Sequence, residues 1–159
     1  LTPSSLRTRK LAAIHMAVCA APAYLEQAGT PTTVAELGQH ACLGYTLGEA
    51  VGSASRWIFG EHGEKSVMIS GPLCANNGDV LREAAIAGQG IIYQPTFMVA
   101  DALKTGSLTT LTLDVPPVLG PPLHAVYAPG LTTPLKVRVM IDFLASHYGP
   151  VPPWDKPEG

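Results

Sequence analysis

The apolar positions near the start of the chain form one strand-like run and two short helical patterns. The run is almost free of polar residues and predicts a buried strand over 12–19. Pro22 then begins a helix that ends before Gly29, because proline suits the first helical position and glycine the position after the last. Thr33 and Glu36 have capping-box spacing, which predicts a second, brief helix.

The middle of the chain changes to short apolar or alternating runs between glycine, serine and charged residues. Three of these runs predict strands, over 42–46, 56–60 and 65–71, and the last two form a hairpin. A short strand or loop over 73–76 leads into a helix that is capped by Asn77 or Asp79 and ends near Ala87. We expect the apolar face of this helix to contain Val80, Ala84 and Ala87. Arg82 and Glu83 are expected to face solvent.

The last third of the chain continues this alternation of strands and helices. Strands are predicted over 91–94, 108–113 and 124–129, of which the first and last are expected to be buried. A helix is predicted over 96–104, and a later connector that can be neither helix nor central strand contains Pro116, Pro117, Pro121 and Pro122. The longest helix has Thr133 as its N-cap, Pro134 at its first position and an apolar stripe formed by Val137, Met140, Ile141, Leu144 and Tyr148. The alternation predicts an α/β protein with a mainly parallel sheet.

Composition narrows the class of protein. The chain has 159 residues, which suits one ordinary domain or two small lobes, and 47% of them are hydrophobic, which argues against disorder. Ten Lys and Arg against twelve Asp and Glu give a net charge of −2, so a strongly basic nucleic-acid surface over the whole chain is not expected.

The ends and the cysteines suggest a compartment. No membrane span and no signal peptide are expected, and the missing initiator Met suggests an internal start. Three cysteines without a CxxC pair, Cys19, Cys42 and Cys74, fit buried thiols in a reducing compartment. We therefore expect a cytoplasmic protein.

The candidate chemistry does not favour catalysis. His40 and Cys42 are close enough to suggest a nucleophile pair, but a helix-end histidine and a buried cysteine are favoured instead. The Gly-Ser-Ala-Ser segment over 52–55 is not a nucleophile elbow, and Gly88 and Gly90 follow a helix, whereas a phosphate-binding loop must precede one. No histidine spacing suggests a metal site, so neither a metal nor another cofactor is expected.

Two predicted helix starts could bind an anion through their free N–H groups. One follows Asn76, Asn77, Gly78 and Asp79, where a plain cap or a type I′ turn is an open alternative and the plain cap is favoured. The other follows Ala20, Ala21 and Pro22 at a strand end. If both faced one crevice they would form a carboxylate-binding cleft, which is a matter of topology.

Several segments resemble the effector-binding domain of LysR-type transcriptional regulators, in the order in which that family has them. They are SSLRTRKLA at the start, VCAAPAYLEQAGTPTTVAELGQHACLGY, WIF, NNGDVLREAAIAGQGIIYQPTFMV, GSLTTLT and VYAPGLTTPLKVRVMIDFLASHY. The resemblance covers roughly residues 4–149.

The resemblance implies a type 2 periplasmic-binding-protein-like fold with two α/β lobes. Residues 21–121 would form the second lobe, 1–20 and 122–149 an incomplete first lobe, and 150–159 a tail. The family's winged helix-turn-helix, its linker helix and the opening of its first lobe have no counterpart in this sequence. The chain is therefore not expected to bind DNA by itself.

The resemblance also points to three segments that would contact an effector. They contain Ala20, Ala21, Pro22, Asn76, Asn77, Gly78, Asp79, Pro95, Thr96 and Phe97. Ala21 stands where many relatives have serine, so a side-chain donor is missing there.

The expected function is the sensing of a small effector, with an organic acid as the family-level expectation. The effector would shift the population of conformations and so change the grip of an oligomeric regulator on DNA. A transporter solute-binding protein is the alternative, and an enzyme is the least favoured reading. An incomplete first lobe would leave apolar surface exposed, which predicts self-association as a dimer or larger assembly.

Overall fold

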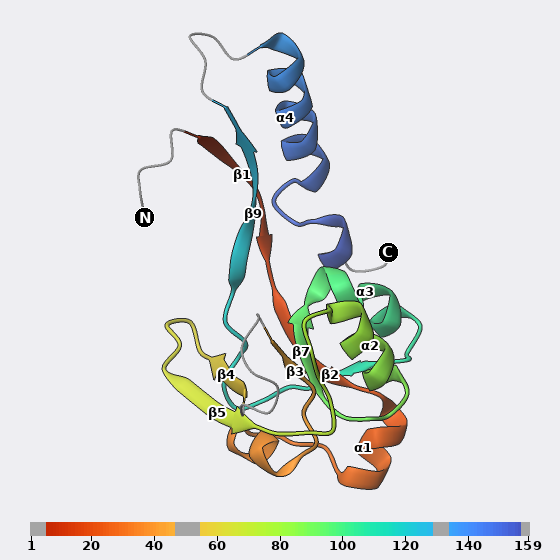
Figure 1. Cartoon of the computed structure of the whole chain (residues 1–159). Coiled ribbons are helices and arrows are strands. Elements are labelled where there is room, and N and C mark those ends of the chain that lie inside the picture. Colours follow the sequence, from red (N-terminus) through yellow and green to blue (C-terminus); the bar gives the residue numbers. More distant parts are fainter. Residues whose placement is uncertain (1–5, 47–54, 129–133, 157–159) are drawn as a thin grey trace. The chain divides into compact units, whose positions relative to one another are not determined.

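The computed structural model describes residues 6–46, 55–128 and 134–156, and only the backbone of Ser55. The chain forms two compact units (Figure 1). Unit 1 combines residues 1–14 and 119–159, and unit 2 consists of residues 15–118. The 52–55 segment and the expected N-cap Thr133 lie outside the described side chains.

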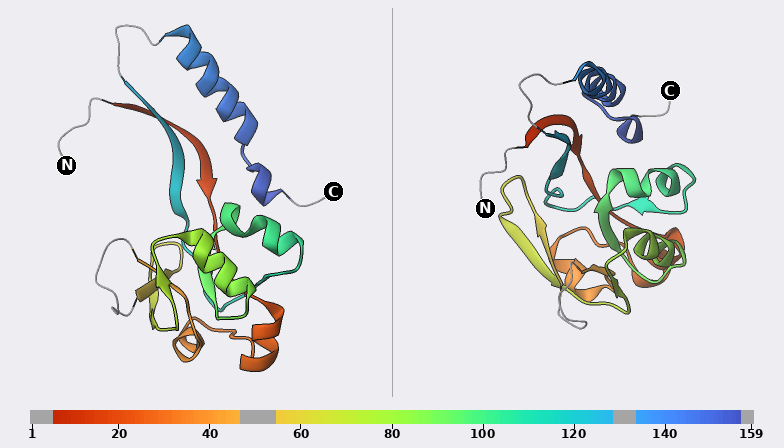
Figure 2. Two further views of the ribbon diagram at one scale, coloured as in Figure 1. Left: turned by 45° about the vertical axis from the view of Figure 1, so that its right-hand side comes forward. Right: turned by 45° about the horizontal axis from the view of Figure 1, so that its top comes forward.

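Unit 1 is a two-stranded ribbon with one helix packed against it. Strands β1 (Arg7–Ile14) and β9 (Gly120–Tyr127) pair antiparallel and lie side by side in both views of Figure 2. Helix α4 (Leu135–Tyr148) packs on β1, and a 3-10 turn, η2 (Pro153–Asp155), follows it. Few residues of this unit are buried, because two strands and one helix have little interior.

Two expectations for unit 1 are corrected. The strand expected over 124–129 begins earlier, and every described residue of β9 remains at least partly exposed. Pro121 and Pro122 lie within this strand. A strand tolerates proline where a backbone N–H is not needed for pairing. In the described sheets β9 pairs only with β1, and the pairing register shifts opposite these two prolines. Along α4 only Ile141 is buried, and Met140, expected in the buried stripe, is 57% exposed.

Unit 2 is built around one strand that is buried at every residue except its first, Met16. In its sheet, β2 (Met16–Ala20) lies between β7 (Ile92–Pro95) and β8 (Thr109–Thr110), antiparallel to both. Ala17 and Cys19 enter one hydrophobic core, and Val18 and Ala20 enter a second one. Burial on both faces explains why this strand is an unbroken apolar run.

The other elements of unit 2 surround this sheet. Its helices are α1 (Pro22–Ala28), the 3-10 helix η1 (Ala35–Gln39), α2 (Gly78–Ile86) and α3 (Thr96–Lys104). Its short strands are β3 (Gly44–Tyr45), which pairs parallel with β6 (Cys74–Ala75), and the hairpin of β4 (Ser55–Phe59) and β5 (Lys65–Ile69).

The mixed α/β class and the helices near Pro22 and Thr96 are confirmed, as is the capping box. The Thr33 hydroxyl accepts from the Glu36 N–H at 3.3 Å, and the Glu36 carboxylate accepts from the Thr33 N–H at 3.4 Å. Backbone donation from Thr32, followed by that from Thr33, holds the pKa of Glu36 below its ordinary value.

The prediction of a mainly parallel sheet is wrong. Among the described strands only β3 and β6 pair parallel, with isolated parallel bridges from Ala41 and Cys42. The expected strand over 12–19 is two strands, separated at the exposed His15. The boundary between the compact units falls after Ile14, because β2 is buried inside unit 2. The expected lobe boundary after residue 20 stays a prediction.

The predicted apolar face of α2 is also wrong. Gly78, Leu81 and Ala85 are buried, whereas Val80 is 48% exposed. Strand β7 and helix α3 pack against the Leu81 side of the helix.

Candidate functional site

The start of α2 is one of the two predicted anion sites. Asn77 is its N-cap, and its side-chain oxygen accepts from the N–H groups of Asp79 at 2.9 Å and Val80 at 3.4 Å. Asn76, Asn77 and Asp79 are exposed, and Gly78 is buried. The plain-cap interpretation is confirmed, and the cap still leaves the Gly78 N–H without an intrahelical partner.

The start of α2 lies against the junction of β7 and α3. A Cβ atom on Gly78 would lie 2.4 Å from Cε of Met98 and 3.2 Å from Oε1 of Gln94. Pro95 is the N-cap of α3, and Thr96 donates to the His15 carbonyl from its N–H at 2.9 Å and its hydroxyl at 3.3 Å. Two of the three predicted segments, 76–79 and 95–97, therefore meet.

The third predicted segment, 20–22, lies elsewhere in unit 2. Met16 pairs with Pro95 and Cys19 with Ile92, so Ala20 is at the opposite end of the β2–β7 pair. Four residues of strand span about 13 Å. Ala20 and Ala21 are almost fully buried, and Ala21 supplies no side-chain cap to α1. The structure does not bring this segment to the other two.

Gln94 is a residue of this region that the sequence analysis missed. It is 3% exposed, and among the described residues it is the one polar side chain that is buried. Its backbone pairs with Ala17, but no described residue hydrogen-bonds its side chain. Its place in an apolar run before a proline gives no hint of this, because the run reads simply as a strand.

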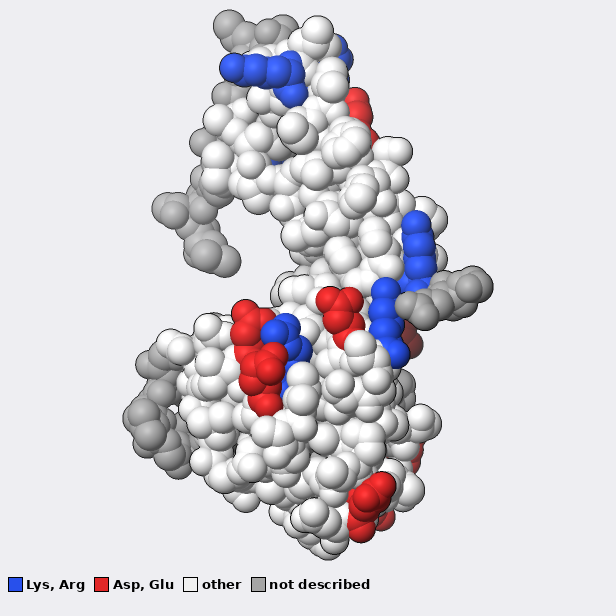
Figure 3. All heavy atoms as spheres, turned by 90° about the vertical axis from the view of Figure 1, so that its right-hand side faces the viewer, with Lys and Arg blue, Asp and Glu red and all other residues white. Residues whose placement is uncertain are grey.

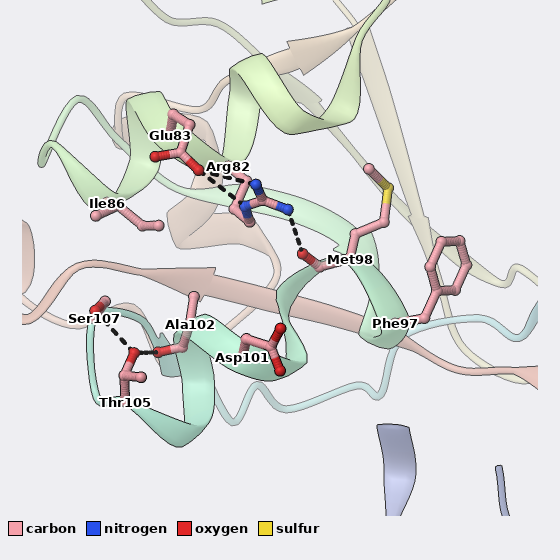
Figure 4. Close-up of a pocket in the computed structure, with 9 residues that line it drawn as sticks. All are labelled: Arg82, Glu83, Ile86, Phe97, Met98, Asp101, Ala102, Thr105 and Ser107. Carbon is pink, nitrogen blue, oxygen red and sulfur yellow. Dashed lines mark hydrogen bonds and ion pairs between the residues drawn. The ribbon is translucent and has the colours of Figure 1, made fainter. Parts of the chain in front are cut away.

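A pocket of about 320 Å³ lies beside this region, between α2 and α3 (Figure 4). Its lining residues are Arg82, Glu83, Ile86, Phe97, Met98, Asp101, Ala102, Thr105 and Ser107. Phe97, one of the predicted residues, is 47% exposed.

The charges of this pocket do not suit an anion. Arg82, which was expected to face water, donates to Asp79 and Glu83, each at 2.9 Å, and to the Met98 carbonyl at 3.2 Å. With Asp101 on the opposite wall, the lining residues carry two acids against one already paired base. Figure 3 shows red and blue atoms together on this unit within a mostly uncharged surface. The pocket itself is therefore a poor place for a carboxylate.

The suggested His40–Cys42 pair is not a catalytic dyad. The Cys42 thiol donates to the Leu37 carbonyl at 3.4 Å, and burial raises its pKa to about 12. The Nδ1 atom of His40 instead contacts the Tyr24 hydroxyl at 3.1 Å. Burial likewise raises the pKa of Cys19 to about 12, so both thiols are poor nucleophiles.

The described ranges contain neither a metal cluster nor a membrane-spanning helix. Within them, three or more metal-ligating side chains do not gather anywhere. No helix among those ranges has both the length and the apolar character needed to cross a bilayer.

Comparison with known proteins identifies a family. Residues 1–149 match the LysR substrate binding domain. The chain is 33% identical over 149 residues to the HTH-type transcriptional regulator CrgA of Neisseria meningitidis serogroup B, covering 94% of this chain and 49% of that protein. It is 28% identical over 146 residues to the HTH-type transcriptional regulator DmlR of Escherichia coli K12, covering 91% and 46%.

Solved structures agree with the sequence matches. The CrgA regulatory domain has a TM-score of 0.72 and 32% identity, over 94% of this chain and 72% of that chain. The full-length Vibrio cholerae virulence activator AphB has a TM-score of 0.73 and 30% identity, over 92% and 49%. The chain spans about half the length of the curated relatives it matches.

Proposed function

Because the chain belongs to the LysR substrate-binding domain family, we propose that it is the ligand-sensing part of a transcriptional regulator and that it binds a small organic acid. The observation that carries this proposal is the meeting of the α2 start with the β7–α3 junction. Gly78 lies there against Gln94 and Met98, the residues that flank Pro95, Thr96 and Phe97. The predicted contacts at Ala20, Ala21 and Pro22 are left out of the proposed site, because that segment lies at the far end of β2.

The start of α2 supports a carboxylate ligand on electrostatic grounds. The uncapped N–H of Gly78 and the helix dipole make the first turn favourable for negative charge. A ligand that binds one conformation of the regulator better than another shifts the population, with a coupling of about 1–3 kcal/mol. Sensing of this kind needs no bond chemistry, and the relatives are named as regulators, which favours it over a transporter solute-binding protein.

DNA contact belongs to another part of such a regulator. The relatives are named HTH-type regulators, and the matched residues span about half their length. We propose that a helix-turn-helix domain outside the matched residues contacts DNA, and that the sensing occurs in the cytoplasm without a metal or other cofactor.

A thermal-shift experiment tests the ligand proposal. Acetate, lactate, succinate and benzoate are added as sodium salts, with sodium chloride as the ionic-strength control. A carboxylate at 100 times its Kd is expected to stabilise the protein by about 2.7 kcal/mol, which raises Tm by about 5–10 °C. Failure of every carboxylate to raise Tm more than sodium chloride does would refute the proposal.

Asn77→Asp locates the site. Aspartate is as good an N-cap as asparagine, so the fold should be kept, while its charge should repel a carboxylate and weaken binding by about tenfold or more. Gln89→Glu is the matched control, because it makes the same amide-to-acid change at an exposed residue after α2. Equal Tm shifts in Asn77→Asp and the wild-type protein would place the ligand elsewhere.

We also infer that the chain self-associates through α4, with a second copy as the partner. Leu135, Val139 and Phe143 are spaced four residues apart on one face, and each is more than half exposed. An antiparallel pair of α4 helices crossing at Val139 would bring Leu135 of each copy to Phe143 of the other.

Charge supports the same arrangement. Lys136 lies three residues before Val139 and Asp142 three residues after it, and both are exposed. A two-fold axis at Val139 would therefore place each lysine near the opposite copy's aspartate, in addition to the ion pair that Asp142 makes with Arg9 of its own chain.

Light scattering during size-exclusion chromatography tests this arrangement. The wild-type chain is expected as a dimer and Val139→Glu as a monomer. Val80→Glu is the matched control, since Val80 is an exposed valine on a helix of unit 2, and it should leave the dimer intact. A monomeric wild-type chain, or a dimeric Val139→Glu variant, would contradict the inference.

A further inference from the structure

We infer that Gln94 selects the ligand by hydrogen bonding a hydroxyl group beside the ligand's carboxylate. This inference rests on the proposed function, because it places the carboxylate at the start of α2. It adds a residue and a ligand class, a short hydroxy acid, to that site.

The first argument is the burial of an unpartnered amide. Gln94 follows Ile92 on the same face of β7, and Ile92 is fully buried in the core that contains Leu81 and Val99. An apolar side chain would continue this core, yet the position holds an amide that no described residue hydrogen-bonds. A side chain this deeply buried normally pairs its polar groups within the protein, so an amide with no partner in the described part of the chain and some remaining access is available to a ligand.

The second argument is position. Oε1 of Gln94 lies 3.2 Å from the point that a Cβ on Gly78 would occupy, so the amide reaches the first residue of α2. Gln94 is nearly buried, but its amide oxygen and nitrogen are not fully enclosed. The amide therefore remains within reach of a ligand held at the α2 start. Met98, whose thioether lies against Gly78, is a flexible neighbour that can adjust around such a ligand.

The chemistry of the two groups defines the ligand. The first turn of α2 offers the N–H of Gly78 to a carboxylate, because Asn77 already accepts from the next two N–H groups. The amide of Gln94 offers a carbonyl acceptor and an NH₂ donor, which together match a hydroxyl group. Arg82, the basic residue of α2, is occupied by Asp79, Glu83 and the Met98 carbonyl, which favours a ligand with one carboxylate at this point over a more highly charged one.

Matched ligand pairs test this selection. Lactate and propionate differ by one hydroxyl group, as do malate and succinate. In the wild-type protein, the hydroxylated member of at least one pair is expected to bind about 10- to 100-fold more tightly by isothermal titration calorimetry, because its absence leaves the amide unpaired. Gln94→Leu should bind both members of each pair equally.

The stability of the ligand-free protein gives a second readout. Replacing an unpaired buried amide by leucine should raise Tm by about 3–10 °C, whereas a purely structural glutamine would lower Tm when it is removed. Gln89→Leu makes the same substitution at an exposed site and should change neither Tm nor ligand preference. If Gln94→Leu does not fold, Gln94→Met, which is unbranched, replaces it.

The outcomes separate this inference from the function beneath it. Carboxylates that bind with no preference for the hydroxyl, and that lose affinity in Asn77→Asp, would refute the role of Gln94 while supporting the proposed site. A lowered Tm in ligand-free Gln94→Leu, or a hydroxyl preference that survives in that variant, would also refute it. Absence of binding by any member of the pairs would overturn the inference, and the wider carboxylate screen then decides the proposed function separately.

Discussion

Gly71→Ala would test the closest backbone approach in unit 2. A Cβ on Gly71 would lie 2.1 Å from the Cys42 carbonyl oxygen and 2.9 Å from its nitrogen, closer than the 3.0 Å below which real Cβ atoms essentially never occur. The Cys42 N–H donates to the Ser70 carbonyl at 2.8 Å, so separating the two segments breaks this bond. On the other side, a Cβ on Gly90 would lie 2.4 Å from the Ala41 carbonyl oxygen, so this strand segment is confined from both directions.

The cost of Gly71→Ala follows from these two effects. Overpacking costs about 1–3 kcal/mol. A buried backbone group left without its partner costs about 1–3 kcal/mol more. The total of about 2–6 kcal/mol lowers Tm by roughly 5–20 °C for a chain of this size.

Circular dichroism during heating and urea titration would measure the change. Gly38→Ala is the matched control, because its Cβ would lie 3.5 Å from Val67 Cγ2, which is an ordinary contact. That variant should stay within about 1 kcal/mol of the wild-type protein. A Gly71→Ala variant that melts within about 2 °C of the wild-type protein would refute the reasoning.

Three further predictions follow from burial and charge. In urea titrations, Leu81→Ala should lower the free energy of unfolding by about 2–5 kcal/mol and Val80→Ala by less than about 1 kcal/mol. The reverse order would show that the face containing Val80 is the buried one, as the sequence predicted. The hydrogen bond from Lys65, aided by a backbone N–H, lowers the pKa of Asp114, so its stabilising contribution is present above the unfolded pKa of about 3.9 and is lost as the pH falls through the lower folded value. The Tm difference between the wild-type protein and Asp114→Asn should therefore be constant above about pH 5 and shrink below about pH 4; a constant difference down to pH 2 would contradict this. Iodoacetamide should modify the exposed Cys74 in the native protein and the other two thiols only after unfolding, as mass spectrometry of the alkylated chain can determine.

Local signals were enough to identify several elements of this fold. Proline at the first position and glycine after the last located α1, and the capping box located the start of η1. The cap at Asn77 was one of two candidates, and the structure selects it. These signals act between residues a few positions apart, so the sequence displays both partners.

Pairing register could not be obtained in the same way. The run before Ala20 reads equally well as one strand or two, and nothing local shows that Met16 pairs with Pro95. That register decides that the 20–22 segment is remote from the 95–97 segment. The resemblance of the sequence to its family supplied a fold and a set of candidate segments, but not the distances among them.

The sequence by itself determined where most helices begin and end and the α/β class, and it only disfavoured a Cys–His pair, which the structure then excluded. Only the tertiary structure decided which face of α2 is buried, which predicted segments meet, and that Gln94 is a buried amide beside Gly78. The physical reason is range. Preferences for particular residues at the two ends of a helix depend on neighbouring positions in the sequence. Burial and strand register depend on segments that are brought together only when the whole core packs.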